Sequence, residues 1–113
     1  MKIVQDKISL SELKKIANNF FDNMIKGVVD IDQELLAIDA ELHSDLEALL
    51  LQDGSQQKNL WGINLYPELA GEDFVEFDSM INMRPSQGNK TRGVENPEIR
   101  KKIVSVVATR VSK

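Results

Sequence analysis

Cysteine is absent from the chain, and aromatic residues make up only 5% of it. Without cysteine there can be no disulfide, no thiol nucleophile and no zinc–thiolate centre, and a reducing cytoplasmic location is expected. Long apolar runs are absent as well. No segment approaches the roughly 20 apolar residues of a membrane span, and the first residues show no apolar run of signal-peptide length, so no membrane association is expected.

An excess of positive charge is also absent. The 14 lysines and arginines are outnumbered by 18 aspartates and glutamates, which gives a net charge of −4. Nucleic acid is therefore a disfavoured partner, because binding it requires a basic surface that displaces counterions from phosphates. The chain does have 42% hydrophobic residues over 113 positions. That content and length predict a single domain, residues 1–113, with a core of its own.

The first amphipathic segment begins at a capping box, in which the Ser9 hydroxyl and the Glu12 carboxylate satisfy main-chain N–H groups at a helix start. Phe21 widens its apolar stripe, and Asp22 lies on its polar side. Glycine commonly follows the last turn of a helix, so this helix is expected to end at Gly27. The apolar stripe consists of Leu10, Leu13, Ala17, Phe20 and Met24.

Two further helices are predicted, over residues 41–53 and after the pair Asn96 and Pro97. The start of the first is open, because either Asp39 or a capping box beginning at Ser44 would serve. Asn96 is a good N-cap, and Pro97 suits the first helical position, where an N–H would be unpaired anyway. The apolar stripes are Leu42, Leu46, Leu49 and Leu50 in the first helix and Ile99, Ile103, Val106, Val107 and Val111 in the second.

Strand patterns lie between these helices. Residues 2–8 alternate weakly, as an edge strand does, and residues 27–40 are typical of a hairpin that turns near Glu34. A one-residue slip of this hairpin would move every apolar side chain to the other face of the sheet. Pairing about the turn sets Ile31 opposite Leu36 and Val29 opposite Ile38.

A second hairpin is predicted from residues 59–66 and 73–84, which alternate and are joined by a short turn. The order helix, hairpin, helix, hairpin, helix predicts an α+β fold, a two-layer domain in which a mainly antiparallel sheet carries three helices packed largely on one face. The sheet residues expected to face the helices are Val29, Ile31, Leu36, Ile38, Trp61, Ile63, Leu65, Val75, Phe77 and Ile81. The helix residues expected to meet them are Leu10, Leu13, Ala17, Phe20, Leu46, Leu49, Leu50, Ile99, Ile103 and Val106.

The segment from Arg84 to Arg92 concentrates hydrogen-bond donors in an otherwise acidic chain. Gly88 and Gly93 permit turns that point main-chain N–H groups inward, and the helix N-terminus that follows attracts anions. Such a loop suits a phosphorylated or carboxylated ligand; the alternative is a solvated loop tethered by arginine–carboxylate pairs. Arg84 is expected to be partly buried and paired with a carboxylate. The predicted ligand-binding residues are Asn82, Arg84, Ser86, Asn89, Lys90 and Arg92.

A polar face is predicted on the other side of the sheet. Its carboxylates would either act as acid, base or ligands of a hard cation, or form the solvated side of an antiparallel sheet. The acidic candidates are Asp30, Glu76 and Asp78, with Asp39, Asn64 and Asn82 as expected neighbours on that face.

His43 is the only histidine in the chain. If the second helix begins at Asp39, then Asp39, His43 and Glu47 lie on one side of it, an arrangement that can hold a metal. The alternative is a helix-start histidine bonded to a neighbouring carboxylate. No other pattern indicates a metal or a cofactor, and none is predicted.

A resemblance rests on four stretches of the chain: Glu41–Glu47, Gly54-Ser55, Leu60–Asn64, and Ser79–Pro85 with Gly88-Asn89. Together they resemble a family of short bacterial proteins that is catalogued only as a domain of unknown function. The resemblance covers nearly the whole chain. It implies a compact stand-alone domain and brings no assigned activity and no catalytic residues.

Two classes of function follow from these residues. The first is a non-enzymatic binding or interaction domain that self-associates, as a homodimer for example, because a second copy would bury exposed sheet edges. The second is an enzyme or ligand-binding protein for a small anionic molecule, in which the Arg84–Arg92 loop clamps the anion and Glu76 or Asp78 serves as base. No catalytic residue can be named from the sequence, so both classes stay open at this point.

Overall fold

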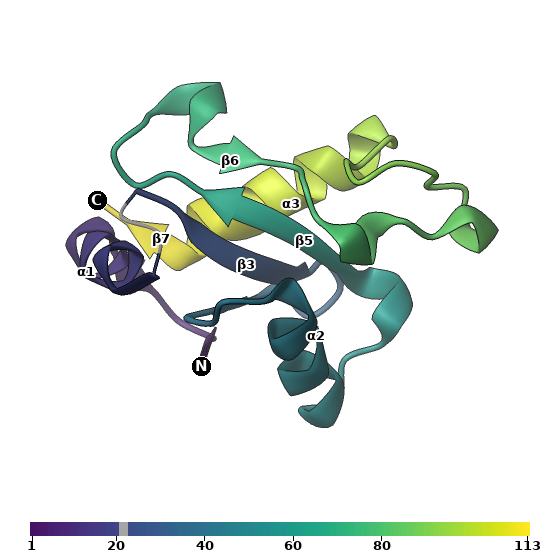
Figure 1. Cartoon of the computed structure of the whole chain (residues 1–113), viewed down its shortest axis with the longest axis horizontal. Coiled ribbons are helices and arrows are strands. Elements are labelled where there is room, and N and C mark those ends of the chain that lie inside the picture. The colour runs from purple at the N-terminus through teal and green to yellow at the C-terminus, as the bar shows by residue number, and fades with distance from the viewer. Residues whose placement is uncertain (21–22) are drawn as a thin grey trace.

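Five strands form one sheet in the order β1-β4-β3-β5-β6, and each neighbouring pair is antiparallel (Figure 1). The structure is a computed structural model that describes residues 1–20 and 23–113. With its three helices, this sheet confirms the predicted α+β class. The strands are β1 (Lys2–Val4), β4 (Leu35–Ile38), β3 (Ile25–Asp30), β5 (Leu60–Leu65) and β6 (Val75–Glu76).

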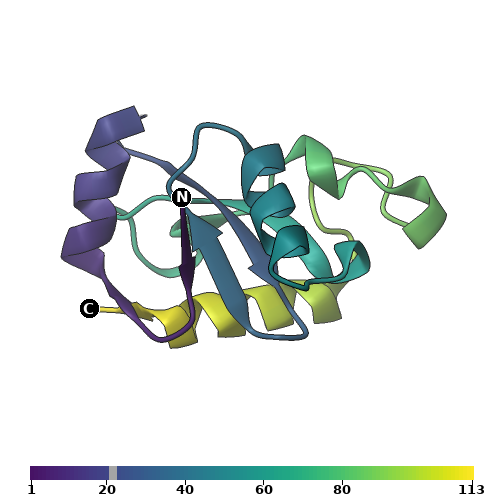
Figure 2. The same cartoon turned by 90° about the horizontal axis from the view of Figure 1, so that it is seen from below.

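Helices cover both faces of the sheet. Helices α1 (Leu10–Phe20) and α3 (Pro97–Arg110) contribute to the core on one face, and α2 (His43–Gln52) packs on the other. Figure 2 shows α2 and α3 on opposite sides of the sheet. The leucines of α2 were expected to meet the same face as the other two helices, and that expectation is wrong. Strand β4 is apolar on both sides, and Val28 and Val29 of β3 join opposite clusters, which is the pattern of strands buried from above and below.

The core consequently has two parts, one on each side of the sheet. Of the ten sheet residues expected to face the helices on one side, nine lie in the cluster under α1 and α3, and Ile81 instead joins the cluster under α2. The larger cluster includes Leu13, Ala17, Val29, Leu36, Ile38, Trp61, Ile63, Leu65, Ile103, Val106 and Val107. The smaller one is built from Val28, Leu35, Ala37, Leu46, Leu50 and Leu60.

The first hairpin pairs two residues away from the predicted register. Val29 lies opposite Leu36, and Gly27 lies opposite Ile38. An even shift keeps every side chain on its predicted face, so the packing prediction survives the error in register. The turn is longer than predicted because the Asp30 carboxylate accepts hydrogen bonds from the N–H groups of Asp32 and Gln33, at 2.9 Å each.

Helix α1 ends earlier than predicted, because Gly27 belongs to β3 instead of terminating the helix. A run of β-branched residues in the segment is taken into the centre of the sheet. Phe21 and Asp22, which the sequence assigned to this helix, lie outside the described residues. Half of the capping box is confirmed: Ser9 Oγ accepts from the Glu12 N–H at 3.1 Å, whereas the Glu12 carboxylate pairs with Lys2 at 2.7 Å.

The start of α3 agrees with the sequence. Asn96 Oδ1 accepts a hydrogen bond from the Glu98 N–H at 2.8 Å, and Pro97 occupies the first turn. After α3 the chain forms a short strand, β7 (Val111–Ser112), which pairs in parallel with β2 (Ile8–Ser9). This ribbon joins the two ends of the chain, and no local pattern predicts it because its partners are far apart in sequence.

The predicted strand over residues 73–84 is wrong beyond its first residues. Only Val75–Glu76 pairs with β5, and the chain then turns through two short 3-10 helices, Met80–Asn82 and Pro85–Gln87. The Asn82 side chain takes the place of a strand: its Oδ1 accepts from the Gly62 N–H at 2.8 Å, and its Nδ2 donates to the Gly62 carbonyl at 2.9 Å.

Gly62 permits this arrangement because it has no side chain. A Cβ at this position would lie 2.5 Å from Ser79 Cβ. We therefore expect Gly62→Ala to lower the free energy of unfolding by about 1–3 kcal/mol, measured by urea unfolding, because the overpacked contact must shift two backbone segments.

Gly27→Ala is the matched control in the neighbouring strand. Its new Cβ would meet the tip of Leu36 at 3.3 Å, which is a movable side-chain end. We expect a change below about 1 kcal/mol there, since replacing glycine also reduces the freedom of the unfolded chain. Adding Ser79→Gly should recover part of the loss in Gly62→Ala; equal losses in both alanine variants would contradict the close approach.

Candidate functional site

Arg84 anchors the start of the loop that the sequence singled out. It is half-buried, as predicted, and its guanidinium donates to the carbonyls of Gln57 at 2.6 Å and Leu60 at 2.5 Å. The guanidinium also lies over the Trp61 ring, 4.2 Å from its centroid. The expected carboxylate partner is replaced by main-chain carbonyls. Burial lowers the pKa of Arg84, and the charge of Glu47 opposes that effect.

Two asparagines of the predicted site are buried inside the loop. Asn82 is 0% exposed, and Asn89 is 4% exposed. Besides binding Gly62, Asn82 donates to the Arg92 carbonyl at 2.9 Å. Asn89 Nδ2 donates to the Asn82 carbonyl at 2.7 Å and the Gly93 carbonyl at 2.8 Å. The donor groups of both amides are therefore bonded to main-chain carbonyls.

A carboxylate of the loop region, that of Glu95, binds the main-chain donors of the loop. The carboxylate of Glu95 accepts hydrogen bonds from the main-chain N–H groups of Lys90 and Thr91. The sequence analysis expected main-chain N–H groups of this loop to bind the phosphate or carboxylate of a ligand. The side chains of Ser86 and Lys90 are exposed. The loop is therefore held by its own contacts, and the Glu95 carboxylate accepts from the N–H groups of its turn.

Asp30 lies apart from the other two acidic candidates. It is 0% exposed, and its second oxygen accepts from the Ser55 hydroxyl at 2.6 Å and from the Gln33 amide at 3.2 Å. Charge-assisted bonds of this kind stabilise a buried carboxylate. Asp30 therefore ties the hairpin turn to the segment after α2.

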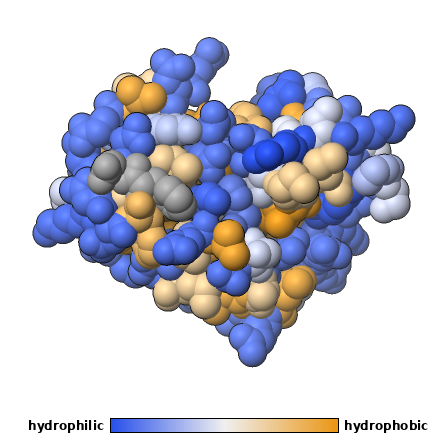
Figure 3. Space-filling model, viewed as in Figure 1, coloured by the Kyte–Doolittle hydropathy of each residue, from blue (hydrophilic) through white to orange (hydrophobic). Residues whose placement is uncertain are grey.

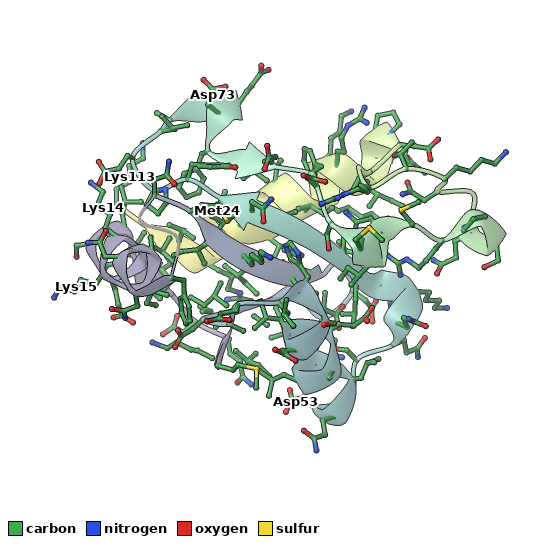
Figure 4. All side chains as sticks on the ribbon, in the orientation of Figure 1. Lys14, Lys15, Met24, Asp53, Asp73 and Lys113 are labelled. Carbon is green, nitrogen blue, oxygen red and sulfur yellow. The ribbon has the colours of Figure 1, made fainter. Side chains whose placement is uncertain are left out.

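Glu76, Asp78 and Arg92 do come together, in a cleft of about 550 Å³ on the α2 side of the sheet. Figure 3 shows this side as a largely hydrophilic surface with scattered apolar groups. Met24 borders the cleft at the beginning of β3 (Figure 4). The other lining residues are Lys26, Leu42, His43, Ser44, Asn64, Tyr66, Ser79, Met80 and Ile81.

The floor of the cleft contains a row of three paired residues. Lys26 in β3 pairs with Asn64 in β5, and Asn64 pairs with Glu76 in β6. Helix α2 begins beside this row, so its apolar face covers the sheet further along while the row itself borders the cleft. A cation, an amide and a carboxylate thus follow one another across three strands.

Asn64 is the central residue of the cleft. It is 6% exposed, and its Nδ2 donates to Glu76 Oε1 at 2.9 Å and to the Asp78 carbonyl at 3.3 Å. These two bonds set the orientation of the amide. Its Oδ1 is buried and has no hydrogen-bond partner among the described residues. A buried acceptor without a donor is costly, and such a group indicates a place for a bound donor.

Glu76 and Asp78 form the negative end of the cleft. The Tyr66 hydroxyl donates to Glu76 Oε1 at 2.9 Å, and Arg92 Nε donates to Asp78 Oδ1 at 2.8 Å. Burial raises the pKa of Tyr66, and the hydrogen bond and negative charge of Glu76 add to that effect. The tyrosine is therefore a neutral hydroxyl at physiological pH.

His43, in the first turn of α2, is held as a neutral ring. Its Nε2 lies 2.8 Å from the Ile63 carbonyl, so the proton of the neutral ring is assigned to Nε2. Burial lowers the pKa of His43, and the charge of Lys26 acts in the same direction. The Ile63 carbonyl, the Asn64 side chain and the charge of Asp78 favour the protonated ring, and burial outweighs them.

The open end of α2 also borders the cleft. Its N-cap is Leu42, which has no side-chain oxygen, so neither Asp39 nor Ser44 caps the helix. Asp39 lies outside the helix with φ of 74°, and the metal-binding alignment of Asp39, His43 and Glu47 therefore does not form. Within residues 1–20 and 23–113, no three histidine or acidic side chains gather in a way that could hold a metal ion.

Sequence reasoning placed Asn64, Glu76 and Asp78 on one polar face, and the structure brings them together. It did not assign His43 or Tyr66 to that face. Tyr66 follows Asn64 at the period-two spacing of a strand, which is the signal that would have found it. His43 comes from a different element, and only the packing of α2 brings it to the cleft.

The architecture defines a small α+β domain with helices on both faces of an antiparallel sheet and a polar cleft at one end of the α2 face. The chain belongs to the family of proteins of unknown function DUF5674, whose model matches residues 2–110. No curated protein and no solved structure matches the chain. In the described part of the chain, no helix is long and apolar enough to cross a membrane.

The lowered pKa of His43 predicts a pH dependence of stability. Between the folded pKa and the ordinary value of 6.5, the unfolded state binds more protons than the folded state. The free energy of unfolding should therefore rise with pH through this window and lose the contribution as pH falls below it. We expect urea unfolding to show a smaller slope in this window for His43→Gln than for the native chain. A ring pKa at or above 6.5 in an NMR titration would contradict the assignment.

Proposed function

We propose that this chain is a non-enzymatic binding domain whose cleft takes a small, polar, charged molecule. The observation that carries the proposal is Asn64, which lines a cleft of about 550 Å³ and whose buried Oδ1 has no hydrogen-bond donor among residues 1–20 and 23–113. Small-molecule sites commonly have this size and combine apolar walls with a few placed polar groups.

The state of the titratable groups favours binding over catalysis. Nucleophilic catalysis needs a hydroxyl in contact with its base, and Ser44 follows His43 directly on one helix, where adjacent side chains diverge. The Nε2 position of His43 is committed to the Ile63 carbonyl. Glu76 already accepts two hydrogen bonds on one oxygen. These groups are arranged to orient a ligand.

The cleft replaces the loop as the proposed site for the anionic part of a ligand. Arg92 is the only predicted ligand-binding residue among those that line it. The main-chain donors of Lys90 and Thr91 are already bonded to Glu95, so an added phosphate would have to displace an internal carboxylate. Nucleic acid is not a proposed ligand, because two carboxylates border the cleft.

The test is a titration of ¹⁵N-labelled protein with pooled amino acids, organic acids, sugar phosphates and nucleotides. We expect at least one pool to shift the amide signals of Asn64, His43 and Glu76. Asn64→Ala should weaken binding of that compound at least tenfold, about 1.4 kcal/mol, because the placed acceptor is lost. Lys90→Ala, in the loop, should bind that compound with unchanged affinity. A screen in which no pool moves the cleft signals would overturn the proposal.

We propose self-association as a second function, on the opposite face. An apolar groove of about 360 Å³ lies between the turn before β6 and the end of α3. Leu69 is 50% exposed and Val104 is 47% exposed. Lys113 borders one part of the groove. The turn that begins at Gly71, another lining residue, carries Glu72 and Asp73. A two-fold axis through the groove allows the lysine of one copy to meet the acidic turn of the other, and this charge complementarity is why a second copy is the proposed occupant.

Light scattering after size-exclusion chromatography tests this second proposal. We expect a dimer at tens of micromolar and a monomer for Val104→Glu, because the substitution places a charge in the apolar groove. Lys102→Glu, an exposed change on the same helix outside the groove lining, is the control and should stay dimeric. A monomeric native chain at that concentration would contradict self-association.

A further inference from the structure

We infer that the ligand of the cleft is a small zwitterion, with an ammonium and a carboxylate a few ångströms apart as in a free α-amino acid. The inference rests on the proposed binding function and specifies its chemistry. It is carried by the separation of charge along the cleft, with a carboxylate end, a cationic end and an unpaired buried acceptor between them.

The ammonium is assigned to the end formed by Glu76 and Asp78. Tyr66 and Asn64 both donate to Oε1 of Glu76, and we assign Oε2 to the ligand. Asn64 lines the same cleft, and its buried Oδ1 has no donor among the described residues. An ammonium has three N–H donors and no acceptor, so it can satisfy a carboxylate and an amide oxygen together. Arg92 offsets the charge of Asp78 at this end, so the charge that remains there is the negative charge of Glu76, which would repel a ligand carboxylate.

The carboxylate is assigned to the end where α2 begins. The first main-chain N–H groups of a helix have no acceptor within the helix, and its dipole places partial positive charge there. Leu42 provides no side-chain cap, and Leu42, His43 and Ser44 all line the cleft. The charge of Lys26 reaches this end, since it lowers the pKa of His43. Asn64 lines the cleft beside this helix start, since its side chain interacts with the His43 ring, and its buried unpaired oxygen is the independent observation that the helix start borders a ligand site.

The two ends have a spacing that suits a small molecule. Lys26, Asn64 and Glu76 are directly paired across three strands. Adjacent strands lie about 4.8 Å apart, so the outer two Cα atoms are separated by about 10 Å. That span accommodates a ligand of a few heavy atoms between the charged ends.

The charge balance of the cleft disfavours simple ions. Lys26 and Arg92 offset Glu76 and Asp78, and His43 is neutral, so the lining has no net charge. Because Arg92 pairs with Asp78, a plain anion would meet the charge of Glu76 at one end, and a plain cation would meet Lys26 and the positive end of α2 at the other. A dipolar ligand meets the complementary charge at both ends, which is how charge arrangement provides specificity.

The test uses the twenty amino acids as separate probes in ¹⁵N NMR titrations. The amino acid that binds most tightly is then compared with its N-acetyl derivative, which lacks the ammonium, and with its amide, which lacks the carboxylate. We expect both derivatives to bind at least tenfold more weakly. Equal affinity for either derivative would overturn the zwitterion. A dipeptide that binds more tightly than the amino acid would overturn the short separation of charge and assign the cleft to a peptide.

Glu76→Gln separates a specific role of the carboxylate from a general effect of charge. We expect the substitution to weaken binding of the amino acid at least tenfold and to leave the affinity for the N-acetyl derivative unchanged. Glu72→Gln removes the same charge from the exposed turn and should have no effect. If amino acids fail while an organic acid, sugar phosphate or nucleotide shifts the cleft signals, the zwitterion is overturned and the binding function stands. If no compound class shifts them, the binding function itself fails.

Discussion

The pairing between the Asn82 amide and the main chain of Gly62 is the constraint on which the rest of the structure depends. It uses the N–H and the carbonyl that a further sheet residue would otherwise take, at 2.8 and 2.9 Å. Strand pairing with β5 therefore ends at Glu76, the last residue of β6, and the chain turns away toward the Arg84–Arg92 loop. The same amide holds the Arg92 carbonyl, so one side chain joins the sheet edge to both ends of the loop.

The cleft is a consequence of this early end of the sheet. Because β6 has only two residues, Asp78 and Ser79 lie along the wall of the cleft and do not continue the strand. Helix α2 supplies the opposite wall by beginning beside the row that contains Asn64. A longer β6 would have paired along β5 and left a flat, solvated sheet face in place of a cleft.

The Arg84–Arg92 loop shows why a donor-rich sequence does not by itself identify a ligand site. Its asparagines, Asn82 and Asn89, are buried against main-chain carbonyls, and Glu95 occupies the donors of its turn. The same residue types, such as asparagine and arginine, serve both to bind ligands and to hold a loop in place. The difference lies in non-local contacts, such as Arg84 with the segment before β5, which spacing along the chain does not reveal.

The sequence by itself determined the features that depend on neighbouring residues. The Asn96 cap, the Ser9 cap and the alternation of Val28 and Val29 follow from local hydrogen bonding and strand periodicity. Only the tertiary structure decided which face α2 covers, where β6 ends, and that His43 meets Asn64 and Glu76 in one cleft. These outcomes depend on close approach at Gly62 and on competition between distant partners for the same main-chain groups, which local propensity does not contain.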